Sequence, residues 1–167
     1  MKILTTIRTN FNCSLERAFK TPMLCDVTRV HSGYGLMSRV THSTEDQSWG
    51  KPGGSRKIFI EKSIYFKGGE ASLDKVIERI ENQYWKIELS NFKFWTGGLT
   101  KFEGEWKTKE INPENTEVIY SYTMFSDNLL LYPFQWVLTK VLWRKYMKHV
   151  LENVRDLAYT KAPYLYS

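Results

Sequence analysis

Histidine is the first residue type to examine for catalysis, because its pKa lies close enough to neutrality for it to accept and donate protons. The chain has three, His31, His42 and His149, which are far apart in the sequence. No HxxxH, HExxH or GxSxG spacing pairs any of them with a second catalytic group. We expect all three on the surface, and only His149, beside Tyr146 and Val150 on a predicted helix, is a candidate for a buried site. The sequence therefore assigns no catalytic residue.

Motifs for nucleotides and metals are also absent. The glycine-rich run at residues 50–55 lacks the GxxxxGK[ST] order of a phosphate-binding loop, and no helix is predicted after it. Cys13 and Cys25 stand in no CxxC or other metal-ligand spacing, so we expect free, reduced thiols. The sequence thus predicts neither a metal nor another cofactor.

Large rings give the strongest chemical signal, since 15% of the residues are aromatic, with six Trp and ten Tyr. Such rings fill cores, and they also line pockets for apolar ligands. The predicted cavity residues are Trp85, Ile87, Leu89, Phe102, Trp106, Tyr120, Tyr122 and Met124 on strands, and Leu142, Tyr146, Met147 and Val150 on a helix. The phenols of Tyr120, Tyr122 and Tyr146 would orient a ligand, or donate protons if the cavity is catalytic. The alternative is that these rings pack into a core without a cavity.

One long amphipathic helix is predicted over residues 133–160 to form one wall of this cavity. Its apolar residues recur every four positions, and cationic residues recur at the same interval on the opposite face. Pro133 suits the first helical position, where its missing N–H would have no partner. The apolar stripe consists of Leu138, Leu142, Tyr146, Val150 and Val154. A helix with such a face must pack against a large surface.

Strands are predicted to supply that surface. Residues 2–10 form the first, followed by a short helix at 15–19, capped by Asn12 or Ser14 and ended by Thr21-Pro22, and by a second short helix within 23–30. Further strands are predicted at 34–42, 56–66, 84–92, 99–111 and 117–125, with a loop at 43–54. Residues 72–81 have a helical period, but a strand after a hairpin turn at Gly68-Gly69 would pair with both neighbours without a crossover. We therefore predict a strand there.

Length, charge and hydropathy limit the other classes of protein. A chain of 167 residues predicts a single domain, residues 1–167. The net charge of +6 is spread along the chain instead of gathered in one run, which favours a solvated surface over a nucleic-acid site. No signal peptide and no apolar stretch of membrane-spanning length is recognised, which predicts a cytoplasmic location. The oligomeric state is left open as monomer or homodimer.

A membrane surface is a further candidate partner. The apolar residues Leu129-Leu130-Leu131-Tyr132, Trp136 and Trp143 lie close in sequence to the cations Lys140, Arg144, Lys145 and Lys148. Apolar and aromatic side chains beside a basic face are typical of transient docking on anionic lipid. The alternative, which we prefer from the sequence alone, is that the leucines close one end of the cavity.

The order of these elements resembles the START/SRPBCC superfamily of helix-grip proteins, in particular its polyketide cyclase/dehydrase-like branch. Residues 14–19 look like the opening P-x-E-x-V-F helix of that family, residues 52–56 like its glycine turn before the third strand, and residues 115–120 like its final G-T-x-V-x-W strand. The resemblance implies an α+β helix-grip fold, with a curved antiparallel sheet of about seven strands around a long C-terminal helix and two short helices after the first strand.

Proteins similar to this superfamily hold a lipid, polyketide or other apolar, often aromatic ligand between sheet and helix. We therefore expect this chain to bind a hydrophobic small molecule in that cavity. A cyclase or dehydratase-like enzyme using the same cavity is the first alternative. A ligand-free module that contacts proteins or membrane surfaces is the second.

Overall fold

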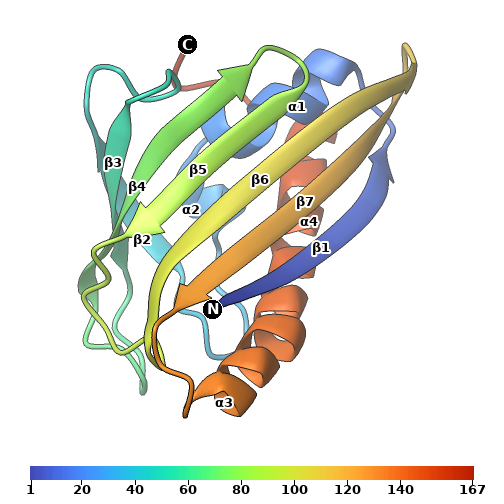
Figure 1. The fold of residues 1–167 in the computed structure, drawn as a ribbon. Coiled ribbons are helices and arrows are strands. Elements are labelled where there is room, and N and C mark those ends of the chain that lie inside the picture. The colour runs from blue at the N-terminus through green and yellow to red at the C-terminus, as the bar shows by residue number, and fades with distance from the viewer.

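The computed structural model describes all residues 1–167, and it consists of a seven-stranded antiparallel sheet packed against a long C-terminal helix (Figure 1). The strands are β1 Lys2–Phe11, β2 Val40–Glu45, β3 Ser55–Ile60, β4 Gly69–Ile80, β5 Tyr84–Ser90, β6 Leu99–Asn112 and β7 Asn115–Ser126. The helical segments are α1 Leu15–Leu24, α2 Val27–Val30, α3 Tyr132–Val137, the π-helical η1 Leu138–Trp143 and α4 Arg144–Tyr159. The predicted helix-grip architecture is confirmed.

The sheet runs in the order β1-β7-β6-β5-β4-β3-β2, so β2 to β7 form a meander and the first strand closes its far edge. Residues 69–80, for which period and pairing gave opposite predictions, form a strand. The ladder shifts register within β3–β4, β4–β5 and β6–β7. Such irregularities bend strands, which lets the sheet curve around the helix.

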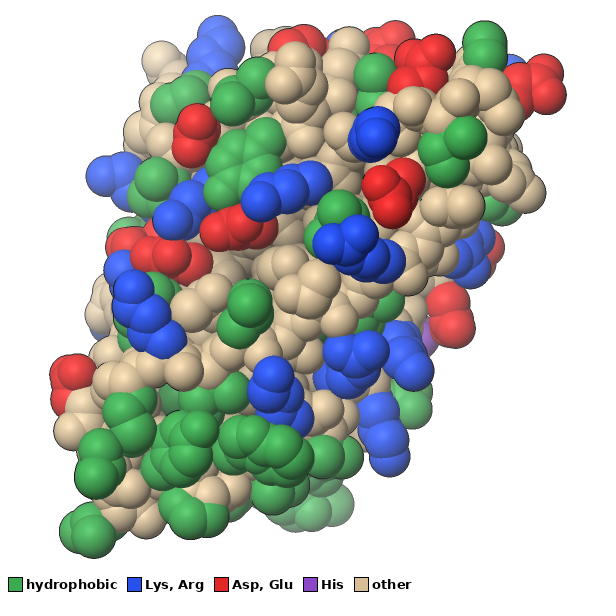
Figure 2. Space-filling view, turned by 45° about the vertical axis from the view of Figure 1, so that its right-hand side comes forward, with side chains coloured by type: hydrophobic (Ala, Val, Ile, Leu, Met, Phe, Trp, Pro, Cys, Tyr) green, Lys and Arg blue, Asp and Glu red, His purple; other side chains and the backbone are tan.

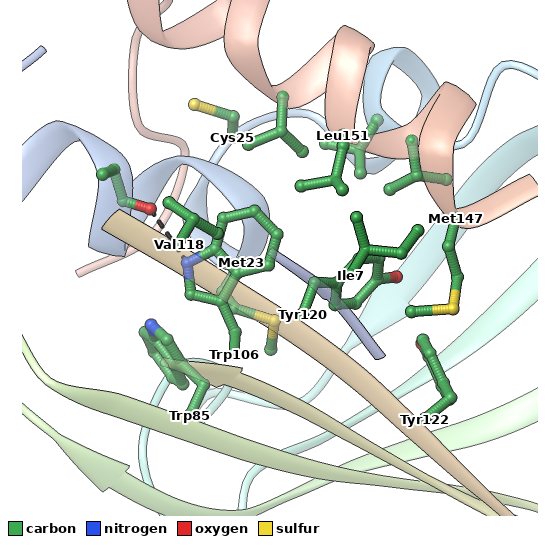
Figure 3. Close-up of a cluster of buried hydrophobic side chains, with 14 of the residues drawn as sticks. Ile7, Met23, Cys25, Trp85, Trp106, Val118, Tyr120, Tyr122, Met147 and Leu151 are labelled. Carbon is green, nitrogen blue, oxygen red and sulfur yellow. Dashed lines mark hydrogen bonds between the residues drawn. The ribbon is translucent and has the colours of Figure 1, made fainter. Parts of the chain in front are cut away.

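The core lies between the concave face of the sheet and the helices. Along β7 every second residue is buried, as expected for a strand with one face against the core. Two tryptophans opposite each other on β5 and β6, Trp85 and Trp106, reach α1 from the sheet. Figure 3 shows them together with Tyr120 and Tyr122 on the side of the sheet that faces Met147 and Leu151.

The predicted boundaries are wrong around β2 and β3. The second strand begins at Val40 and not at Tyr34, because Gly33 and Gly35 take φ values of +87° and +58° and turn the chain before it joins the sheet. The third strand ends at Ile60, and a loop over 61–68 replaces the hairpin turn predicted at Gly68-Gly69. The longer connection leaves residues 61–68 at the end of the sheet.

The first helix begins as predicted, since the Ser14 hydroxyl accepts from the backbone N–H of Arg17. It does not end at Thr21, however, but continues through Pro22 to Leu24. Proline has no N–H to give to the carbonyl four residues earlier, which belongs to Ala18. Trp106 Nε1 donates to that carbonyl at 3.0 Å (Figure 3), so the sheet satisfies the group that proline leaves free.

The C-terminal helix spans 132–159, close to the predicted 133–160, but it contains a π-helical segment, η1. A π turn joins residues five apart instead of four, so the residue one turn after Leu138 is not the one that a four-residue period predicts. Trp143, five residues after Leu138, therefore takes the inward position that the four-residue period assigned to Leu142. Its ring lies 5.3 Å from both Phe102 and Tyr122, measured between centroids.

Candidate functional site

A cavity of about 370 Å³ lies between the concave face of the sheet and the C-terminal helix. Of its 36 lining residues, 26 are hydrophobic, so its wall suits an apolar ligand. The interior rings do not fill the space between sheet and helix, and the core-only alternative from the sequence does not describe this structure.

The structure brings together most of the residues that the sequence placed at the cavity. The wall contains Trp85, Ile87, Leu89, Phe102, Trp106, Tyr120, Tyr122, Met124, Tyr146 and Val150. Leu142 and Met147 are outside it. Leu142 is turned away by the π turn, and Met147 is fully buried among core side chains instead. Leu138 and Trp143 are the helix residues that line the cavity in their stead.

Gly104 gives the cavity part of its width. It lies opposite Ile87 on β5 and Tyr122 on β7 in the ladder. A Cβ at this position would lie 3.0 Å from Ile87 Cγ1 and 3.0 Å from Tyr122 Cζ, closer than ordinary contact. Any larger residue would push both side chains into the empty space or occupy it itself. Gly104 is in phase with the predicted cavity residues Phe102 and Trp106, but the sequence gives no reason to assign a glycine to the site.

A buried ion pair interrupts the apolar wall. Arg56 of β3 and Asp74 of β4 are paired residues in the ladder, and their side chains are 3% and 5% exposed. Arg56 Nε donates to Asp74 Oδ2 at 3.3 Å, and Ser72 Oγ donates to the other carboxylate oxygen at 3.2 Å. The guanidinium also lies over the Trp49 ring, 4.0 Å from its centroid. Burial raises the pKa of Asp74, and the Arg56 charge only partly offsets this rise.

Three groups at the cavity wall that can donate a hydrogen bond have no partner. They are Arg56 Nη1, Trp143 Nε1 and the Ser38 hydroxyl, and all three atoms are buried. A buried donor without an acceptor costs free energy, so the wall has unused capacity to bind an acceptor.

His31 belongs to the same wall, although the sequence placed it on the surface. It follows α2 as the C-cap residue, and its Nδ1 lies 2.7 Å from the hydroxyl of Tyr146, with the two rings stacked. The prediction failed because the direction of a residue at a helix end depends on how that helix packs. His31 shows no local signal, since neither period nor motif distinguishes it.

His31 and the three tyrosines at this wall are held in their neutral forms. Burial, reinforced by the Arg56 charge, lowers the pKa of His31 to about 3. Burial also raises the phenol pKa of Tyr120, Tyr122 and Tyr146, in each case with a contribution from nearby phenol or carboxylate groups. At neutral pH the His31–Tyr146 contact is therefore a hydrogen bond between two uncharged side chains.

The lowered pKa of His31 makes stability depend on pH. Because its pKa is about 3 in the folded chain against 6.5 for free histidine, the unfolded chain takes up a proton first as the pH falls. The contribution of the neutral His31 ring to the free energy of unfolding is complete above pH 6.5 and is lost as the pH falls from 6.5 to 3. The free energy of unfolding should fall between pH 7 and pH 5, and we expect this fall to be about 2 kcal/mol smaller in His31→Gln than in the wild type. Urea unfolding at both pH values measures this, with the exposed His42→Gln as the control that should match the wild type.

The other candidates lie away from the cavity. His149 bonds Ser32 through Nε2 at 2.9 Å and stacks on Tyr34, and it is half-buried outside the wall. Glu103 of β6 is not a wall residue, and its carboxylate bonds Lys86 and Lys101. Cys13 and Cys25 are free, and no group of three or more His, Cys, Asp or Glu residues lies close enough together to hold a metal ion.

The exposed residues of the cavity wall place its opening near α3, which lies at one end of the sheet (Figure 1). The wall residues that are strongly exposed are Leu36, Tyr65, Trp95 and Phe134. Three of them come from the loops at 61–68 and 91–98 and from α3, which places the mouth among these segments. The leucines at 129–131 do not close this end, because none lines the cavity and Leu129 and Leu130 are exposed.

Comparison with solved structures shows which proteins share this architecture. Ara h 8.0201 superposes with a TM-score of 0.71 at 12% identity, covering 96% of this chain and 99% of that one. A point mutant of norcoclaurine synthase from Thalictrum, solved with a transition-state analogue, gives 0.71 at 8% identity, covering 96% of both chains. The di-domain ARO/CYC protein BexL gives 0.66 at 6% identity, covering 92% of this chain and 45% of that one.

These similarities confirm, at the level of the fold, the resemblance to START/SRPBCC helix-grip proteins. No protein-family profile and no curated protein sequence matches the chain.

Proposed function

We propose that this helix-grip chain binds a hydrophobic small molecule with one polar end in the cavity between the sheet and the C-terminal helix. The observation that carries the proposal is the wall itself, which is mostly apolar and includes the buried Arg56–Asp74 ion pair and the His31–Tyr146 hydrogen bond. A pocket of this composition orients an amphipathic ligand, with contact area supplied by the rings and direction by the polar groups.

The apolar wall supplies the larger share of the binding free energy. Burying roughly 200 Å² of apolar ligand surface at about 25 cal/mol/Å² stabilises a complex by about 5 kcal/mol before the entropic costs of association. Hydrogen bonds from the wall to the ligand would add to this and bring the affinity to the micromolar range.

The polar cluster selects the end of the ligand that enters it. A buried ion pair such as Arg56–Asp74 is weak evidence for stability, because well-packed apolar residues do as well or better. Its place in a cavity wall that also carries the unpartnered donors of Arg56 and Trp143 favours a role in binding. A ligand carbonyl, hydroxyl or carboxylate oxygen would satisfy these donors.

A cyclase or dehydratase-like reaction in the same cavity is the second candidate, and the His31–Tyr146 hydrogen bond favours it. Proton transfer is most efficient when the pKa of the catalytic group lies near the working pH. Here the histidine pKa is lowered and the tyrosine pKa raised, so neither group is matched to that task in the empty cavity. For this reason we place binding first.

Native mass spectrometry of freshly purified protein tests the proposal, with a denatured sample as the control. We expect a small molecule that remains bound under native conditions and is released on denaturation. If the protein is empty, 1-anilinonaphthalene-8-sulfonate, which has apolar rings and one anion, should bind saturably to the folded chain. The proposal is contradicted if no molecule is retained under native conditions and the probe also fails to bind saturably.

A substitution at Gly104 tests whether the cavity is where binding occurs. Gly104→Val adds a branched side chain between Ile87 and Tyr122, so we expect probe affinity to fall about tenfold or more. Lys107→Val places the same side chain on the exposed face of β6 and should leave affinity unchanged. Thermal unfolding of both variants checks that they are folded. Equal affinities for the two variants would place the probe outside the cavity.

A further inference from the structure

Exposed apolar side chains gather at the mouth of the cavity. Ile64 is 95% exposed, Leu130 93% and Trp95 74%, and they come from three segments far apart in the chain. Figure 2 shows hydrophobic side chains concentrated at the lower end of the molecule, where Figure 1 places α3. We call the exposed apolar residues of segments 64–65, 95 and 129–137 the apolar tip. A patch of this kind marks an interaction surface.

The apolar tip is built as one unit. Gln135 of α3 is fully buried and donates through Nε2 to the carbonyl of Gly97 at 2.9 Å, which ties α3 to the 91–98 loop. Trp95 and Phe134 stack across this junction with ring centroids 5.6 Å apart. Gly97 has a φ of +68°, and a Cβ there would lie 2.5 Å from the Phe134 ring, so only glycine lets the two segments meet. The exposure of these rings therefore belongs to a packed platform.

A band of positive charge lies next to the apolar tip. Residues 132–148, running from α3 into α4, carry Lys140, Arg144, Lys145 and Lys148 and no acidic residue. Lys140 and Arg144 donate to the carbonyls of Leu4 and Thr6 on the edge strand β1, which itself carries Lys2 and Arg8 and no acidic residue. Figure 2 shows lysine and arginine side chains on the surface above the hydrophobic end. The residue types thus change from apolar to cationic along one side of the molecule.

We propose that this end of the molecule docks on the surface of an anionic lipid bilayer. The apolar tip would enter the boundary between headgroups and acyl chains, and the cationic band would lie against acidic headgroups. A second copy of the chain fits less well, because a symmetric contact through the tip brings two like-charged bands together. None of the helices has the length and hydrophobicity of a membrane span.

Docking in this orientation turns the mouth of the cavity toward the lipid. Tyr65, Trp95 and Phe134 belong both to the apolar tip and to the wall, so an apolar ligand would pass between bilayer and cavity without crossing water. This consequence rests on the proposed function, whereas docking itself does not.

Vesicle flotation tests the docking. The full chain should float with phosphatidylcholine vesicles that contain phosphatidylserine, and less with phosphatidylcholine alone or at high salt. Ile64→Glu combined with Leu130→Glu places two charges in the apolar tip and should weaken binding at least about fivefold. Ile111→Glu is the matched control, because Ile111 is 54% exposed on β6 near the hairpin to β7, away from the tip, and it should bind like the wild type.

Three results would overturn the docking. The first is no flotation with phosphatidylserine vesicles, and the second is an equal loss of vesicle binding in the tip and control variants. The third is a homodimer in light scattering that becomes monomeric in the tip variant, which would assign the face to a second copy. Neither Ile64 nor Leu130 lines the cavity, so probe binding in the same variants reports on the proposed function separately. Lost flotation with intact probe binding is the expected result for the tip variant.

Discussion

Replacement of Asp74 by alanine is expected to lower the free energy of unfolding by about 3–5 kcal/mol, because it leaves the guanidinium of Arg56 buried without its counter-charge. The Arg56 side chain is 3% exposed and has no other hydrogen-bond acceptor, while Nη1 is already without one. Arginine cannot lose its proton to escape this cost. Equilibrium urea unfolding at pH 7 measures the change.

A double variant separates the loss of a charge partner from the loss of packing. Arg56→Met with Asp74→Leu removes both charges and keeps the space filled, and we expect its stability to lie within about 1–2 kcal/mol of the wild type or above it. Probe affinity should nevertheless fall in the double variant, because the polar end of the cavity is gone. A cost below about 1 kcal/mol for Asp74→Ala would show that the pair is not buried in solution.

Asp74 also shows what the sequence could have revealed. Once residues 69–80 are a strand, Ser72, Asp74 and Val76 must share one face, and Val76 belongs to the core. A charged residue in phase with the core is a candidate site residue, since a charge is rarely buried without a role or a partner. The prediction missed Asp74 because only apolar and aromatic residues were counted on the inward face. Its partner Arg56 then follows from the β3–β4 pairing.

The wall on β5, β6 and β7 could be predicted because alternation alone decides which side chains point inward. The helix wall was harder, because the stretch has a four-residue period that runs through the π turn without any visible break. A shift of one residue exchanged Leu142 for Trp143, and with it moved a tryptophan from the expected membrane face into the cavity. His31 and the exposed loop at 61–68 depend on packing between distant segments, which no local pattern reports.

The predicted end of the first helix at Pro22 is wrong for the same reason, because a contact with a distant segment decides it. Proline normally stops a helix because the carbonyl four residues earlier loses its partner and the ring crowds it. In α1 the indole of Trp106 supplies the missing donor to Ala18, and its neighbour Trp85 donates to the next carbonyl, that of Phe19, at 2.9 Å. The sheet thus holds a helix that the local sequence would end at Thr21.

Trp106→Ala is accordingly expected to lower the free energy of unfolding by about 3–5 kcal/mol, since it removes a large buried ring and frees the Ala18 carbonyl. Trp106→Phe keeps much of the ring and isolates the hydrogen bond, at a cost of about 1–3 kcal/mol. A double-mutant cycle identifies the cause. Pro22→Ala restores a backbone donor for Ala18, so the cost of Trp106→Phe should fall by about 1 kcal/mol in that background. An unchanged cost would mean that Trp106 stabilises the fold through packing alone.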